Sequence, residues 1–277
     1  MKNILFAVIL LLSINAFSQK EKKEKSSEKK QTEKIDEKTK FLYKNTFIET
    51  DDYKIYITDA IATQAWTKFK FKIFNKTNDF LLIKVEDLFF TSEGKNLVCS
   101  EKKDIMVSPN DEASKVIDFK GNDFRIENYI IDIKAIFKAS SAGKVLTPSN
   151  FKIPAETNKI EISGLTCIML DSKIKTDKSS AKFECTYNGD AAAIIDPYKC
   201  VAIMDNGKDN ANNKKYPPVL LSKGAKEDFF VMFDEVQGAG DMQKKGFTIK
   251  WNDSFKETKL LPMKGTQIKM VKELEKK

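Results

Sequence analysis

The sequence contains no histidine, and this absence removes the commonest general base of enzymes. Ser-His-Asp and Cys-His catalysis and histidine-rich zinc sites are therefore excluded. A glycine-rich phosphate loop is also missing, because Gly238-Ala239-Gly240 is not followed by the Lys-Ser/Thr pair that such a loop requires. An enzyme built from this chain would have to work with carboxylates, with a Ser-Lys pair or with a cofactor.

Long apolar runs are also missing: beyond the N-terminal segment, no apolar run approaches the ~20 residues that a membrane-spanning helix needs. At the N-terminus, Lys2 precedes the apolar run Ile4–Leu12, and Ala16-Phe17-Ser18 offers a small-x-small cleavage site. These features predict a signal peptide over residues 1–19. Gln19, and not the cysteine of a bacterial lipoprotein, ends this segment. We expect an exported protein, periplasmic or extracellular, that is not a lipoprotein and has no transmembrane segment.

Outside the N-terminal segment, basic residues only slightly outnumber acidic residues. The formal net charge is +8, but removing Lys2 and the nine lysines and six acidic residues of 20–40 leaves 38 basic and 34 acidic groups. A net charge of about +4 on the remainder argues against a dedicated nucleic-acid surface. Residues 20–40, which are rich in Lys and Glu, contain no aromatic residue, and residues 20–44 are predicted to be a disordered linker.

Cysteines are few and unevenly divided. Cys99 falls in the first half of the chain, whereas Cys167, Cys185 and Cys200 fall in the second. An oxidising destination permits disulfides, but this division allows at most one bridge within a half. The pairing stays open at this stage, and Cys185 also fits the role of a small buried residue.

The chain from about Phe47 onward alternates with a period of two. Phe69, Phe71 and Ile73 are separated by lysines, which is typical of a strand with one buried and one solvated face. Turn residues follow at short intervals, and Asp205-Asn206-Gly207 is a strong hairpin signal. About seven short strands in each half predict a β-sandwich.

The two halves also repeat one another. Matching residues lie 112 to 114 positions apart: Phe71 and Phe183, Gly94 and Gly207, Ser108 and Ser222, and Phe119 and Phe233. So little drift in separation favours a duplicated unit. We expect two tandem sandwich domains over residues 45–154 and 155–263, joined by a linker near Pro154–Asn158, with residues 264–277 as a basic C-terminal tail.

The motifs NKTND, LFFTSEGK and SPNDEASKVIDF of the first unit, with YNGD, CVAIMDNGK and SKGAKEDFFVMFD of the second, resemble a known pattern. This chain is similar to the exported bacterial immunoglobulin-like domains of unknown function called DUF4352-like, over about 180 of its 277 residues. The resemblance implies two immunoglobulin-like sandwiches with a binding or spacing role and no catalysis.

Candidate metal ligands occur in the loop DNGKDNANN, where Asp205, Asp209 and Asn212 offer hard oxygen atoms. Their spacing departs from that of a calcium-binding EF-hand loop and lacks a strong terminal ligand. We expect a long hairpin loop here and no cofactor. Calcium, bound by these three residues, is the alternative.

Candidate contact residues are aromatic. Trp66 and Trp251 lie at strand ends, where tryptophan either stacks on a sugar ring or closes the end of a sandwich. In Phe89-Phe90 and Phe229-Phe230 one member of each pair must face outward. We select Phe90 and Phe229, with the two tryptophans, as the ligand or partner contacts.

The sequence therefore predicts a noncatalytic exported protein of the bacterial envelope that binds or scaffolds an envelope protein partner. The alternative is a carbohydrate-binding module of a surface polysaccharide system, with a glycan as ligand. A carboxylate-based hydrolase is a third hypothesis, because carboxylate pairs such as Glu86-Asp87 are frequent in the chain.

Overall fold

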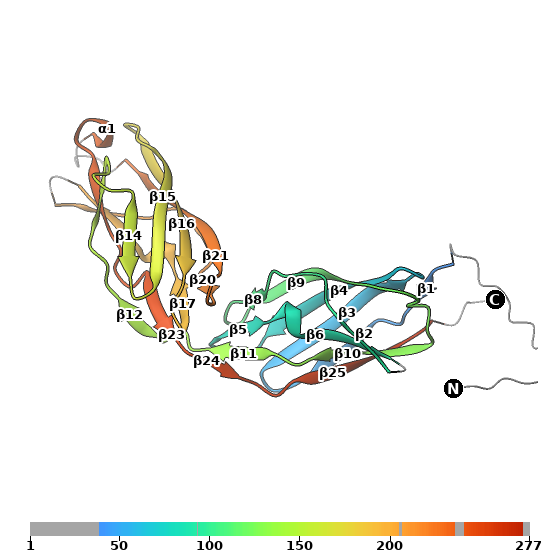
Figure 1. Cartoon of the computed structure of the whole chain (residues 1–277). Helices are drawn as coiled ribbons and strands as arrows, with labels where there is room; N and C mark the ends of the chain where they lie inside the picture. The colour runs from blue at the N-terminus through green and yellow to red at the C-terminus, as the bar shows by residue number, and fades with distance from the viewer. Residues whose placement is uncertain (1–38, 93, 205–206, 236–240, 274–277) are drawn as a thin grey trace, which may run out of the picture. The chain divides into compact units, whose positions relative to one another are not determined.

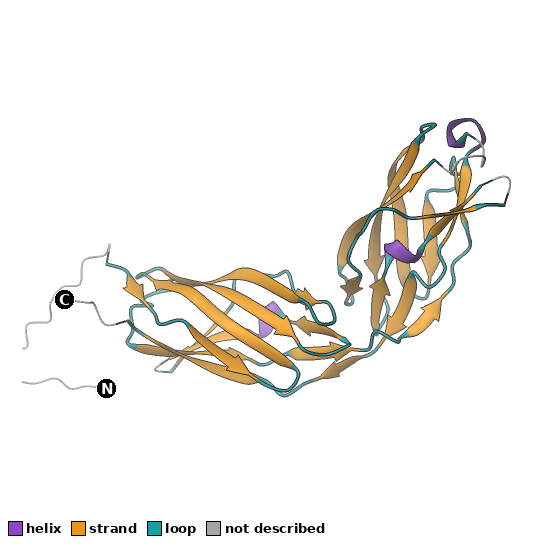
Figure 2. Ribbon diagram, turned by 180° about the vertical axis from the view of Figure 1, so that it is seen from behind, coloured by secondary structure: helices purple, strands orange, loops and turns teal. Residues whose placement is uncertain are grey.

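The structure is a computed structural model that describes residues 39–92, 94–204, 207–235 and 241–273. Within these residues nearly every ordered element is a β-strand (Figures 1 and 2). The exceptions are two 3-10 turns, η1 and η2, and the short helix α1 (Met242–Lys245). The all-β prediction is confirmed. The predicted signal peptide and most of the predicted linker, residues 20–38, lie outside the described residues.

The elements of the chain up to residue 139 belong to the first half of the structure. In chain order they are β1 (Phe41–Leu42), β2 (Thr46–Glu49), β3 (Tyr53–Ala62), β4 (Trp66–Asn75), β5 (Phe80–Ile83), η1 (Val85–Asp87), β6 (Leu88–Ser92), β7 (Lys95–Val98), β8 (Ile105–Val107), β9 (Glu112–Lys120), β10 (Asn128–Ile133) and β11 (Ile136–Ala139).

The elements from residue 144 onward are β12 (Lys144–Leu146), β13 (Phe151–Ile153), β14 (Lys159–Ile162), β15 (Leu165–Lys173), β16 (Lys178–Tyr187), β17 (Ala192–Ile195), η2 (Pro197–Lys199), β18 (Val201–Ile203), β19 (Asp209–Ala211), β20 (Val219–Leu221), β21 (Lys226–Asp234), α1, β22 (Phe247–Lys250), β23 (Phe255–Thr258), β24 (Leu260–Pro262) and β25 (Thr266–Val271).

The front sheet of the first half has the order β1-β3-β4-β9, with β2 also paired to β3. Its inner face follows the predicted alternation: Phe69, Phe71 and Ile73 of β4 are buried, while the lysines between them face outward. The opposite layer consists of two sheets, β25-β10-β6-β7 and β24-β11-β5-β8. Side chains from both layers form one apolar cluster, so this half is a sandwich.

The second half repeats this plan. Strands β15, β16 and β21 pair as β3, β4 and β9 do, and β14 pairs with β15 at the edge. The opposite layer again has two sheets, β13-β22-β18-β19 and β12-β23-β17-β20. A second apolar cluster fills the space between these layers. The matched pairs Phe71 and Phe183, and Phe119 and Phe233, are fully buried in the two cores.

The last strands of the chain complete the first half. β24 pairs with β11 and β25 pairs with β10, so the end of the chain lies beside the first half (Figure 1). In the second half, β12 and β13 occupy the equivalent places: β12 pairs with β23, and β13 pairs with β22. Ile268 and Met270 of β25 point into the first core. The second half, residues 144–258, is therefore inserted between β11 and β24.

Two connections run side by side between the halves, residues 140–143 and Lys259. They continue an antiparallel ladder, because Ala139 is paired with Leu260 and Lys144 with Glu257. The approach is close at Gly143, where an added Cβ would lie 2.5 Å from the Glu257 carbonyl oxygen. Glycine is the residue that this spacing admits.

The predicted domain boundaries need correction. Residues 264–277 are not simply a tail, because Thr266–Val271 is a strand of the first core, and the junction does not lie at residues 154–158. The first half also begins before residue 45: Tyr43 is buried, with its hydroxyl 2.9 Å from the Ile126 carbonyl oxygen. The repeat showed the order of the strands, but their pairing partners are a tertiary property.

Replacing Ile268 with alanine should destabilise the protein by about 2–5 kcal/mol, because it removes buried methyl groups from the first core. Ile268 is 3% exposed, whereas its neighbour Lys269 is exposed and serves as the control. Denaturant unfolding measures the loss, and amide exchange should accelerate in β10 before β22. Equal stability of the Ile268→Ala and Lys269→Ala proteins would contradict the placement of β25.

Candidate functional site

Three strands are buried on both faces, which distinguishes them from the alternating strands of the two front sheets. Every residue of β5, β17 and β20 is buried. One set of side chains enters the core of its own half. The other set forms a third apolar cluster to which both halves contribute, namely Phe80, Leu82, Ala139, Ala192, Ile194 and Leu220. The continuous apolar runs of these strands follow from this double burial.

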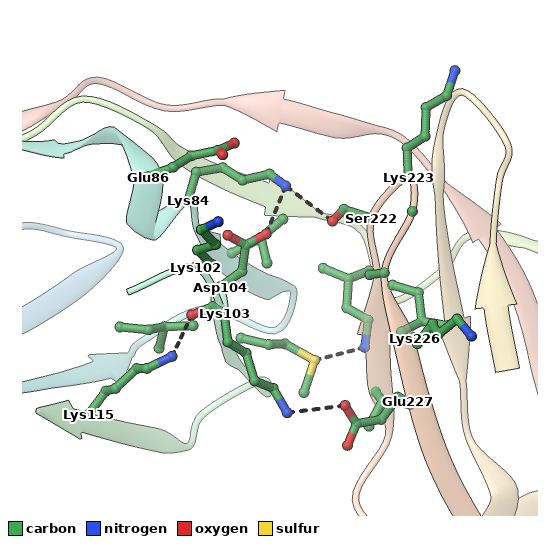
Figure 3. Close-up of a pocket in the computed structure, with 18 of the residues that line it drawn as sticks. Lys84, Glu86, Lys102, Lys103, Asp104, Lys115, Ser222, Lys223, Lys226 and Glu227 are labelled. Atoms are coloured by element: carbon green, nitrogen blue, oxygen red, sulfur yellow. Dashed lines mark hydrogen bonds and ion pairs between the residues drawn. The ribbon is translucent and has the colours of Figure 1, made fainter. Parts of the chain in front are cut away.

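A groove of about 770 Å³ lies next to this third cluster (Figure 3). Its apolar surface comes from β5, β8 and β20, including Leu82, Met106 and Leu220. Its polar rim carries more lysines than acids, and Lys84, Lys103 and other cations line it. The backbone N–H of Leu220 donates a hydrogen bond of 2.8 Å to the Met106 sulfur across the groove.

A further hydrogen bond and an ion pair connect the two sides of the groove. Lys84 donates to Asp104 at 2.7 Å and to the Ser222 hydroxyl oxygen at 3.1 Å, as Figure 3 shows. Further along, Lys103 lies 3.3 Å from Glu227. These contacts join the end of β5 to the β20–β21 turn and the loop before β8 to β21, so the charged groups of the rim are used largely by the fold itself.

The Lys84–Ser222 contact raises the question of a serine nucleophile, because a neutral lysine can take a serine proton. Here the Lys84 ammonium forms a charge-assisted hydrogen bond with Asp104. In both contacts the Lys84 side chain is the donor, to the Asp104 carboxylate and to the Ser222 hydroxyl oxygen. Ser222 therefore serves as a hydrogen-bond acceptor that links the two sides. Lys223, which follows Ser222 in the sequence, pairs with Asp190 at 2.7 Å.

A second surface exposes charged and aromatic side chains to solvent. The outward side of the front sheet of the first half gathers lysines and aromatic rings, and we call it the basic-aromatic face. Its residues are Phe47, Lys54, Tyr56, Trp66, Lys68, Lys70, Lys72 and Phe74. Strand register makes them neighbours, since Tyr56 is paired with Phe47 on one side and with Lys72 on the other. A shallow hollow of about 360 Å³ lies on this face.

Interactions between cations and rings organise the basic-aromatic face. Lys54 lies 4.7 Å from the ring centre of Phe47 and 5.0 Å from that of Tyr56, and Lys68 lies 5.1 Å from Trp66. The Glu49 carboxylate contacts Lys76 at 2.6 Å and Lys54 at 3.2 Å. Hydrogen bonds from Lys76 and then Lys54 lower the pKa of Glu49. One carboxylate shared by two ammonium groups leaves this corner positively charged.

The equivalent face of the second half keeps one lysine–ring contact, Lys182 with Phe230 at 5.6 Å, but differs at other positions. By strand register, Ile168 and Glu184 stand where the first half has Tyr56 and Lys72. Lys182 is retained at the position of Lys70, but it pairs with Asp228 at 2.6 Å. The two halves share a fold and present different surfaces.

The predicted aromatic contacts are mostly buried. Trp251 is 2% exposed and packs against Phe183 and Phe255, so it closes the second core. Phe90 and Phe229 are also buried, while Phe230 is 40% exposed. One member of each pair does face outward, but the choice of Phe90 and Phe229 was wrong because the phase of the alternation was assigned incorrectly.

Trp66 alone among the predicted contacts lies at the surface. It is half-buried at the start of β4, on the basic-aromatic face. By sequence alone, the lysines beside it are typical of the solvated side of a strand. Their interleaving with Tyr56 and Phe74 across the register was the signal that could have found this surface.

The predicted calcium ligands are not assembled in the described residues. Asn212 is 2% exposed, and its side-chain oxygen accepts hydrogen bonds from the backbone N–H groups of Lys214 and Met232. Asp209 is exposed on β19, and Asp205 lies outside the described residues. Across the described ranges, no cluster of three or more metal-binding side chains is found. The prediction for Asn212 is corrected, because its oxygen is already occupied.

Cys167 and Cys185 form a disulfide between β15 and β16, where they are directly paired, with Cα atoms 4.0 Å apart. Cys99 and Cys200 are free and buried. Burial raises the pKa of the Cys200 thiol to about 12 and also raises that of Cys99. One bridge within the second half agrees with the limit set by the sequence.

No protein-family model matches the chain, and no curated protein matches its sequence. Among the described helices, none has the length and apolar character needed to cross a membrane.

Replacing Leu82 with alanine should destabilise the protein by about 2–5 kcal/mol, since Leu82 is 2% exposed in the third cluster. Because this cluster joins the halves, amide exchange should increase in both β5 and β17. Leu42→Ala, at a 49% exposed position of the first half, is the control. Faster amide exchange confined to β5 would show that the third cluster does not couple the two halves.

Stability should fall at alkaline pH through Cys200. Its folded pKa of about 12 lies above the ordinary value of 9.0, so its contribution is complete below pH 9 and is lost as the pH rises toward 12. The free energy of unfolding of the wild-type protein should therefore decrease more steeply above pH 9 than that of Cys200→Ala. Parallel pH profiles of the two proteins would exclude this contribution.

Proposed function

We propose that this chain is a noncatalytic binding protein of the bacterial envelope and that the basic-aromatic face is its recognition surface. The features of residues 1–19 support export to the periplasm or the cell exterior. The motif resemblance to DUF4352-like immunoglobulin-like domains supports a binding or spacing role. The observation that carries the proposal is the exposed grouping of lysines and aromatic rings on one sheet of the first half.

The scaffold suits recognition because the face is built on paired strands and not on loops. β4 is hydrogen-bonded on both sides, to β3 and β9, so its outward side chains are held at fixed spacing. Exposed apolar and aromatic residues on this face include Phe47 at 59% and Val116 at 62%. Surface groups of this kind, ringed by charge, are typical of interaction sites.

The partner in this proposal is an acidic component of the envelope. A protein and a surface glycan are the two candidates, and Trp66 together with Tyr56 favours the glycan, because aromatic rings provide flat apolar surfaces for sugars. Calcium has no part in the proposal, since Asn212 is already hydrogen-bonded.

The test is co-sedimentation of the mature protein with envelope fractions of the native organism. The variant Tyr56→Ala/Lys70→Ala should bind at least about tenfold more weakly, which corresponds to the loss of one good contact. Ile168→Ala/Lys182→Ala alters the equivalent positions of the second half and should bind like the wild type. Retained binding by the first variant, with loss in the second, would overturn the assignment of the face.

A further inference from the structure

The hollow on the basic-aromatic face identifies the ligand more closely. Lys54, Tyr56, Lys70, Lys72 and Phe74 surround it, with Glu112 at its edge. Glu112 holds Lys72 at 2.7 Å, and Lys54 shares Glu49 with Lys76. Lys70 forms no ion pair with any residue of the described chain, and its side chain lines the hollow. The hollow therefore offers an uncompensated positive charge beside two aromatic rings.

We propose that this hollow binds an acidic sugar unit of a polysaccharide, a proposal that rests on the binding role given above. The anionic group of the sugar lies against Lys70 and Lys54. The apolar side of the sugar ring lies against Tyr56 and Phe74. This assigns one ligand class to the surface, a sugar chain bearing carboxylate or sulfate groups.

The size of the hollow fits a sugar unit. About 360 Å³ lies at the lower end of the range of small-molecule sites. A protein interface buries roughly 800 Å² on each partner, and its centre is depleted of lysine. The centre of this face is instead a row of lysines, Lys68, Lys70 and Lys72. The composition therefore favours a charged sugar over a folded protein partner.

The row of lysines indicates a polymer. Alternate residues of a strand are about 7 Å apart, so the three ammonium-bearing positions extend over roughly 14 Å. This distance exceeds the length of one sugar ring. Trp66, whose ring centre lies 5.1 Å from the Lys68 ammonium nitrogen, extends the surface further along β4. Lys72 is paired with Glu112, so a chain of acidic sugars lying along β4 would meet cations without an ion pair among the described residues at Lys70 and Lys68.

The second half provides the contrast within the same molecule. Its equivalent face retains Lys182 but neutralises it with Asp228, and Thr186 and Ile168 replace the two rings. An acidic sugar chain should therefore bind one half only. This asymmetry supplies a matched control at each position of the hollow.

The experiment is calorimetric titration of the mature protein with alginate, dextran sulfate, neutral dextran, poly-glutamate and single-stranded DNA. Alginate or dextran sulfate should bind, more weakly as salt rises, because the contact is partly electrostatic. A preference for one identifies the anionic group as carboxylate or sulfate. Neutral dextran should not bind, and poly-glutamate and DNA should bind at least about tenfold more weakly than the preferred acidic sugar.

Three variants separate the contributions. Lys70→Ala should weaken binding of the acidic sugar about tenfold, and Lys70→Arg should retain it because the charge remains. Tyr56→Leu keeps apolar bulk and removes the ring, so it should weaken sugar binding without altering the thermal midpoint. Lys182→Ala should have no effect.

The outcomes distinguish this inference from the proposed function. Equal affinity for poly-glutamate or DNA, or an unchanged affinity in Tyr56→Leu, would reduce the face to a general polyanion surface and overturn the inference. Failure of both acidic sugars, with envelope binding that still depends on Lys70, would also overturn it and leave a protein partner. Envelope binding that ignores Lys70 would overturn both.

Discussion

The rest of the structure depends on the burial of strands β5 and β17 on both faces. Their side chains fill the core of each half on one side and the third cluster on the other. Burial of apolar surface stabilises by about 25 cal/mol per Å², so the third cluster links the two halves. The paired connections at residues 140–143 and at Lys259 form a second link. The groove and its ion pairs lie where the two halves meet because these links bring them together.

The same arrangement separates structural charges from available ones. In the groove, Lys84 is paired with Asp104 and also donates to Ser222 of the second half, and Lys103 is paired with Glu227, so these cations are engaged within the fold. On the basic-aromatic face, Lys70 has no acidic partner among the described residues. Counting lysines would rank the groove first, whereas the pairing of each ammonium group favours the sheet face as the binding surface.

Alternation placed Phe71 and Phe183 correctly in the cores, because one buried face imposes a period of two. The same rule required one outward member in Phe229-Phe230, but local spacing did not reveal the phase, and Phe230 is the exposed one. Asn212 looked like a metal ligand, yet it hydrogen-bonds the backbone of a strand that is distant in sequence.

The amino-acid order alone determined the strands, their turns and the repeat, since these follow from side-chain alternation and backbone preferences within about ten residues. The sequence also excludes catalysis and metal binding by histidine, because it contains no histidine. Only the tertiary structure decided that β25 completes the first half and that the lysines of β4 share a face with Tyr56 and Phe47. Strand pairing joins segments that are far apart in the chain, and register, not sequence spacing, sets which side chains meet.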